Sequence, residues 1–198
     1  EEAFAPVRPG RAVTAREMPT GSHPGGHIHD DTEQVHLVLG GRAIARGDAD
    51  REALDIANHV LGGGLSSRLF DEIRERRGLA YSVFSSVSTF ADCGAWTIYA
   101  GSQPATAPAV RELIEVECSR LVDEGITEEE LADAKGFLQG AFELGLEDSG
   151  ARMSRLGGSL TLLGRLVPID EQLARWSAVD LDDVARVVDR VFGGPQVA

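Results

Sequence analysis

The stretch Gly62–Val83, GGGLSSRLFDEIRERRGLAYSV, contains the signals on which the fold prediction depends. Its run of glycines ends an apolar segment and permits backbone approaches that a Cβ would block, which predicts a tight turn. Ser66 or Ser67 then predicts the N-cap of a short helix, with acidic residues early, arginines late, and Gly78 after its end. The stretch therefore predicts a turn, a helix and the start of a strand.

The segment after Gly78 alternates as a strand over residues 79–90. Its predicted faces are Leu79, Tyr81, Val83 and Val87 on one side and Ala80, Ser82, Phe84 and Phe90 on the other. Turn residues then lead to a second strand over 95–100, which predicts an antiparallel hairpin. An earlier strand is predicted from Gln34 to Leu39, stopping at Gly40-Gly41.

Helical periodicity accounts for most of the remaining chain. Helices are predicted over about 48–61, 104–124, 128–146 and 149–163 and from near Asp170 and Asp180, with a capping box at Thr127 and Glu130. A few antiparallel strands and a large mass of helix predict an α+β fold, an antiparallel-rich sheet with helices packed on one face.

Composition is that of a globular chain of 198 residues, 42% hydrophobic and 26% charged. Residues 1–31 are rich in proline and glycine and predict a linker or extended arm, so a single domain is expected over 32–198. The net charge of −13 would repel nucleic-acid phosphates and anionic membranes, which argues against both as partners.

Cysteine usage and the absence of targeting signals suggest a location. Cys93 and Cys118 have no metal-ligand or redox-motif spacing, so free thiols in a reducing compartment are expected. No apolar run approaches bilayer length and no signal peptide is present. We expect a cytoplasmic protein, and the start at Glu1 suggests a piece of a longer polypeptide.

Two short motifs have a possible ligand-binding interpretation. The triple glycine before a helix could cradle a phosphate, but it lacks the lysine of a P-loop, and a tight turn is favoured. His23, His27, His29 and His36 could chelate a metal, but they lie in the predicted arm without fixed geometry. No zinc-peptidase motif or serine nucleophile elbow is present, so no metal site or catalytic residue is predicted in this chain.

Arg74 and Tyr81 are the remaining candidates, because both are predicted near the junction of the short helix with the strand. A guanidinium and a phenol at one place could hold a peptide carbonyl or stabilise charge that develops on it. On the residues alone, a surface arginine and a core tyrosine are the favoured interpretation.

The run from Leu61 to Val83 closely resembles the second-domain signature of the pitrilysin and mitochondrial-processing-peptidase family of zinc metallopeptidases. Gln34–Leu37, Thr127–Lys135 and Leu146–Ser149 also resemble that domain, so the resemblance covers roughly residues 33–192. It implies a sheet covered by helices and a zinc motif carried by a separate first domain. That motif is absent here, so the chain alone is expected to be inactive.

The resemblance also implies a role for Arg74 and Tyr81, which match in type and seven-residue spacing a pair with which such second domains bind peptide substrate. The implied function is that of a substrate-binding C-terminal domain, with zinc held by a catalytic domain of the same or a partner chain. The alternative is a domain of an inactive family member that presents substrate to a zinc-bearing partner. The sequence leaves homodimerisation open.

Overall fold

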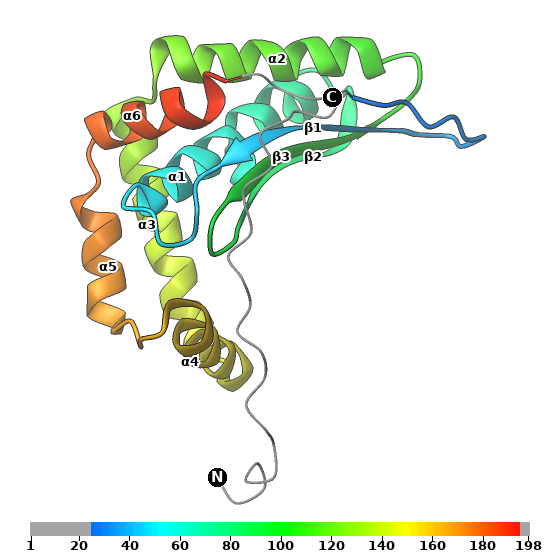
Figure 1. The fold of residues 1–198 in the computed structure, drawn as a ribbon. Coiled ribbons are helices and arrows are strands. Elements are labelled where there is room, and N and C mark those ends of the chain that lie inside the picture. The colour runs from blue at the N-terminus through cyan, green and yellow to red at the C-terminus, as the bar shows by residue number, and fades with distance from the viewer. Residues whose placement is uncertain (1–24, 195–198) are drawn as a thin grey trace, which may run out of the picture.

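The computed structural model describes residues 25–194, which contain a three-stranded antiparallel sheet (Figure 1). The strands are β1 (Val35–Ala43), β2 (Ala80–Thr89) and β3 (Gly94–Ser102), in the order β1-β3-β2. The predicted hairpin is confirmed as β2 and β3. Most of the predicted arm lies outside the described residues, so the division at residue 31 stays a prediction.

β1 is longer than predicted, because the strand continues through Gly40-Gly41 to Ala43. Gly41 is paired with Trp96 on the adjacent strand, and a Cβ there would lie 2.7 Å from the indole Nε1. A Cβ at Gly40 would lie 2.7 Å from the Trp96 carbonyl oxygen. Glycine therefore serves here for close approach within a strand, not for a turn. The indole Nε1 in turn donates to the Val191 carbonyl at 3.2 Å and ties the sheet to the last helix.

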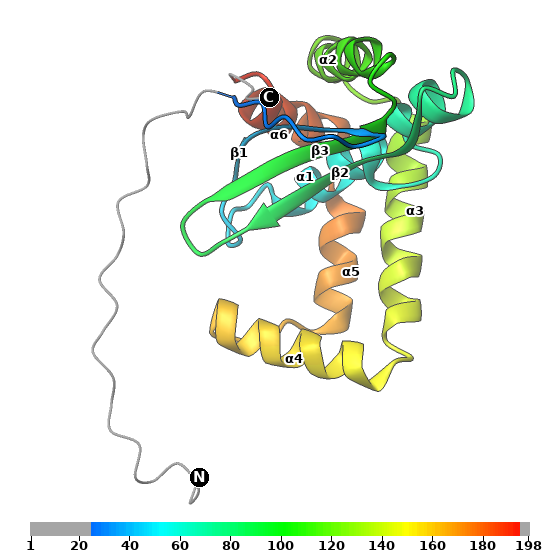
Figure 2. The same ribbon diagram turned by 90° about the vertical axis from the view of Figure 1, so that its right-hand side faces the viewer.

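Helices cover one face of the sheet and extend beyond it (Figures 1 and 2). Their bounds are α1 (Arg51–Asn58), η2 (His59–Gly63), η3 (Phe70–Glu75), α2 (Ala107–Glu124), α3 (Glu128–Gly145), α4 (Ser149–Leu163), α5 (Ile169–Ala178) and α6 (Leu181–Phe192). Both η segments are π-helical. The predicted α+β architecture is confirmed, although α2 begins three residues later than Pro104 predicts.

The main core lies between the sheet and the helices α1, α2 and α6. Leu39, Ile98 and Trp96 supply the sheet side, and α6 buries a stripe of valines at helical spacing. In contrast, α3, α4 and α5 project away from the sheet in Figure 2, and α4 buries none of its residues. No helix within residues 25–194 lies over the opposite face of the sheet (Figure 2).

Candidate functional site

The triple glycine brings the end of the first helix against β2. A Cβ at Gly62 would lie 2.6 Å from the Ser85 backbone nitrogen, and the Ser85 hydroxyl donates to the Asn58 carbonyl at 3.0 Å. The predicted serine cap is wrong: the Ser67 hydroxyl donates to the Gly64 carbonyl at 2.6 Å and caps no amide. These glycines therefore serve packing and turning.

Gly62→Ala is expected to lower the free energy of unfolding by about 2 kcal/mol, because the added methyl group must displace backbone that cannot yield cheaply. Gly63→Ala is the matched control, since its Cβ would meet nothing closer than 3.2 Å. Urea unfolding of both variants measures the difference. An equal loss of unfolding free energy in the two variants would contradict the contact assigned to Gly62.

The turn at Gly78 fixes the path from η3 into β2. Gly78 has a φ of 61°, as expected for the residue that follows a helix. Its N–H bonds to the Arg74 carbonyl at 3.1 Å, and the Leu79 N–H bonds to the Ile73 carbonyl at 2.9 Å. These two bonds close the last turn of the helix and hold the Arg74 backbone directly beside the start of the strand.

Tyr81 lies at an irregularity in the register of β2. Ala80 pairs with Ser102 and Ser82 pairs with Gly101, so Tyr81 is the extra residue of a β-bulge. The predicted alternation fails here: Ala80 and Val83 are buried, whereas Tyr81 is 80% exposed. The interpretation of Tyr81 as a core residue is therefore wrong, because the bulge turns its side chain outward.

The Arg74 guanidinium lies against two aromatic rings. Its Cζ is 4.7 Å from the centre of the Phe70 ring and 5.1 Å from that of Tyr81, both within the range of cation–π attraction. Its nearest carboxylate contact is a 3.9 Å approach to Glu75. Within residues 25–194, neither the guanidinium N–H groups of Arg74 nor the Tyr81 hydroxyl takes part in a hydrogen bond. The contacts between the two side chains hold these groups in place, and the groups remain able to bond to a ligand.

Both side chains line a pocket of about 370 Å³ at the end of the sheet. The other lining residues are Gln34, Gly78, Leu79, Ala80, Gly101, Ser102, Gln103 and Thr106. Ser102 is only 4% exposed, and its hydroxyl has no hydrogen-bond partner among the described residues. The pocket thus combines a cation, a phenol, two amides and hydroxyls, which are the groups that bond to peptide N–H and C=O.

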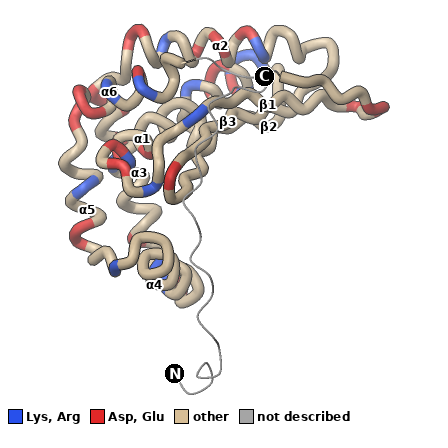
Figure 3. Tube along the Cα trace, in the orientation of Figure 1, with Lys and Arg blue, Asp and Glu red and all other residues tan. Residues whose placement is uncertain are grey.

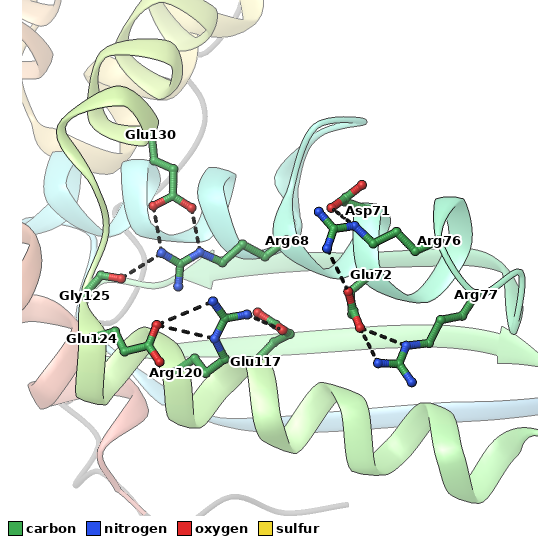
Figure 4. Close-up of polar contacts among 10 residues, drawn as sticks. All are labelled: Arg68, Asp71, Glu72, Arg76, Arg77, Glu117, Arg120, Glu124, Gly125 and Glu130. Atoms are coloured by element: carbon green, nitrogen blue, oxygen red, sulfur yellow. Dashed lines mark hydrogen bonds and ion pairs between the residues drawn. The ribbon is translucent and has the colours of Figure 1, made fainter.

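Arg68 anchors the start of the helical segment that carries Arg74 (Figure 4). Its guanidinium donates to both carboxylate oxygens of Glu130 at 2.7 Å and to the Gly125 carbonyl at 2.8 Å. The same Glu130 side chain accepts from the Thr127 N–H at 2.8 Å, which completes the predicted capping box. Burial tends to raise the pKa of Glu130, but the bonds from Arg68 and Thr127 outweigh it and hold that pKa below its usual value.

Sequence reasoning assigns no role to Arg68 or Ser102. A capping-box glutamate normally bonds only to its own helix, so nothing local indicates that Glu130 also accepts from an arginine 62 positions earlier in the chain. The register of β3 is likewise needed to place Ser102 beside Tyr81. Both contacts depend on segments that are distant in sequence.

The described residues do not form a metal site. Residues 25–194 hold no group of three or more histidine, cysteine, aspartate or glutamate side chains arranged to bind an ion. His27 and His29 are exposed with ring centroids 6.4 Å apart, and His23 lies outside the described residues. None of the helices between residues 25 and 194 is long and apolar enough to cross a bilayer.

Comparison with known proteins identifies relatives of the whole domain. The chain is 46% identical over 162 residues to an uncharacterized zinc protease of Streptomyces coelicolor, covering 82% of this chain and 35% of that protein. It is 38% identical over 162 residues to the uncharacterized zinc protease YmxG of Bacillus subtilis, covering 82% of this chain and 40% of that one. The chain thus spans little more than a third of the length of these relatives.

A solved structure and a family model agree with these relatives. The structure of a peptidase M16 inactive domain from Pseudomonas fluorescens superposes with a TM-score of 0.81 at 26% identity, covering 92% of this chain and 43% of that one. A family model described as the peptidase M16 inactive domain matches residues 11–138. The resemblance inferred from Gly62–Val83 is confirmed, and the chain belongs to the peptidase M16 inactive-domain family.

Proposed function

We propose that this chain is the substrate-binding domain of a zinc metallopeptidase, and that Arg74 and Tyr81 hold the backbone of a bound peptide. The observation that carries the proposal is that the Arg74 guanidinium lies over the Tyr81 and Phe70 rings, while no group within residues 25–194 accepts a hydrogen bond from it. Stacking fixes the direction of the donors before a ligand arrives, so less side-chain entropy is lost on binding.

The chemistry of the pocket suits a peptide carbonyl. Arg74 can donate to a carbonyl oxygen or to an oxygen that gains negative charge, and the Tyr81 hydroxyl can donate beside it. The Ser102 hydroxyl and the amides of Gln34 and Gln103 line the same pocket and can bond to neighbouring peptide groups. We expect the domain to bind an extended peptide through main-chain atoms, independently of most of its side chains.

Zinc belongs to the proposed whole protein and not to this domain. The relatives are named zinc proteases, whereas the described residues offer no ligand set for the metal. A catalytic domain in the same or a partner chain would therefore supply the metal, and a cytoplasmic location remains part of the proposal. A catalytically inactive parent that presents substrate to such a partner would need the same peptide-binding site.

Peptide binding by this chain tests the site directly. Arg74→Ala is expected to weaken the binding of a short, capped, neutral peptide by roughly 10- to 100-fold, because a hydrogen bond from a charged donor contributes roughly 1.5–3 kcal/mol. Isothermal titration calorimetry measures the dissociation constant.

Arg77→Ala is the matched control, since Arg77 lies in the turn just after the same helix but pairs with Glu72 at 2.6 Å. Unchanged affinity in Arg74→Ala, or an equal loss in both variants, would refute the assignment.

A further inference from the structure

The open face of the sheet differs in charge from the rest of the molecule. The chain contains 32 aspartates and glutamates, yet none of them lies in β1, β2 or β3 (Figure 3). Leu39, Ile98 and Ser85, which are paired across the three strands, are buried on the helix side. Their neighbours in each strand therefore point to the opposite face, which none of the helices of the described part of the chain covers.

An apolar row crosses this open face from edge to edge. Val38 and Phe84 are both register partners of Tyr99, and residues directly opposite each other share a face. The Phe84 and Tyr99 rings lie 5.2 Å apart, while Val38 is 56% exposed and Phe84 46% exposed. We call these three residues the aromatic shelf.

Tyr99 is held in a defined position on the shelf. The His36 ring stacks on the Tyr99 ring at a centroid distance of 5.9 Å, and the His36 Nδ1 is hydrogen-bonded to the Tyr99 hydroxyl at 2.8 Å. A Cβ at Gly101 would lie 3.1 Å from the same hydroxyl, so glycine leaves room for the phenol to lie along the strand. A fixed ring loses little conformational freedom when a ligand packs on it.

The shelf is continuous with the pocket of Arg74 and Tyr81. Gly101 lines that pocket and stands two residues along β3 from Tyr99, and the Tyr99 hydroxyl lies over it, 3.1 Å from where a Cβ at Gly101 would be. Two residues of strand span about 7 Å, which is the distance between side chains on one face of an extended peptide. A peptide held at the pocket can therefore place a nearby side chain on the shelf.

We propose that the aromatic shelf is a specificity subsite that accepts an uncharged apolar or aromatic side chain of the peptide held by Arg74 and Tyr81. The proposal rests on the proposed function and adds the class of substrate. Two rings packed together next to an aliphatic side chain favour an apolar group. The three strands contain no acidic residue that could pair with a basic side chain. The occupant is therefore a peptide with an apolar residue near its main-chain anchor.

Two capped peptides of alternating serine and alanine test the proposal, one with phenylalanine at its centre and the other with serine there. We expect this chain to bind the phenylalanine peptide about tenfold more tightly, because a phenylalanine side chain gains that much from partial burial. Phe84→Thr and Val38→Thr should each remove most of this preference, since each replaces an apolar shelf side chain by a smaller or more polar one while threonine remains a good strand former.

Phe90→Thr is the matched control, because Phe90 is 54% exposed just beyond the end of β2. It lies six residues from Phe84, roughly 20 Å along the strand direction. Circular dichroism and urea unfolding confirm that each variant is folded. The proposal predicts that Phe90→Thr keeps the preference for the phenylalanine peptide. Arg74→Ala should weaken the binding of both peptides without changing the ratio of their dissociation constants.

The outcomes separate the shelf from the main-chain site. Equal affinity for the two peptides, or a preference that survives both shelf variants, overturns the shelf and leaves the proposed function standing. If neither peptide binds, both the aromatic shelf and the proposed function are overturned. If sedimentation shows that the chain self-associates and that Phe84→Thr makes it monomeric, the face is an interface between copies and the proposal is wrong.

Discussion

Arg74→Ala is expected to lower kcat/KM for peptide hydrolysis about 100-fold in a full-length protein that joins this chain to a zinc-bearing domain, as loss of a donor to developing negative charge does elsewhere. Arg74 is already oriented by its contacts with Phe70 and Tyr81, so its donors need no reorganisation when charge develops. Tyr81→Phe, which keeps the ring and removes only the hydroxyl, should lower kcat/KM about tenfold.

Steady-state kinetics of the two variants and of Arg77→Ala check this prediction. Arg77→Ala should stay close to wild type because its side chain is 52% exposed and paired with Glu72. A fall in kcat with little change in KM would indicate a bond made mainly in the transition state. Unchanged kcat/KM in both Arg74→Ala and Tyr81→Phe would exclude the role, and an inactive wild type would favour the scaffold alternative.

Arg68→Ala is expected to lower the free energy of unfolding of this chain by about 3 kcal/mol, near the lower end for a broken buried ion pair. The Arg68 side chain is 14% exposed and that of Glu130 28%, so the carboxylate loses its partner in a poorly hydrated place. The Gly125 carbonyl loses its donor as well. Urea denaturation at neutral pH measures the loss.

The matched control is Arg111→Ala, which breaks an exposed helical pair with Glu115 and should cost less than about 0.5 kcal/mol. Arg68→Lys keeps the charge but not the bidentate geometry, so an intermediate cost is expected. Similar costs for Arg68→Ala and Arg111→Ala would show that the Glu130 pair contributes little.

The same pair makes stability depend on pH. The pKa of Glu130 in the folded chain lies below its ordinary value of 4.5, because the bonds from Arg68 and Thr127 outweigh the opposite effect of burial. The unfolded state therefore binds the proton first, and the stabilisation is complete above about pH 4.5 and declines as the pH falls through the folded pKa. The difference between wild type and Arg68→Ala should shrink over that acidic range.

Local signals were sufficient for much of the fold. The capping box at Thr127, the left-handed residue Gly78 and the hairpin of β2 and β3 are all present, because each depends on bonds within a few residues. Gly40 and Gly41 were misinterpreted as the end of a strand. They allow close approach of the strand to Trp96, which is 55 residues away from Gly41 in sequence. No local sequence pattern predicts that contact.

The sequence by itself determined the class of fold, the family signature and the pair Arg74 and Tyr81 as residues to consider. Only the tertiary structure decided how that pair is presented. The bulge that exposes Tyr81 arises from the pairing of β2 with β3, and the aromatic shelf exists only where three strands bring Val38, Tyr99 and Phe84 into one row. Alternation specifies which residues share a face within one strand, but register between strands depends on packing of the whole sheet against its helices.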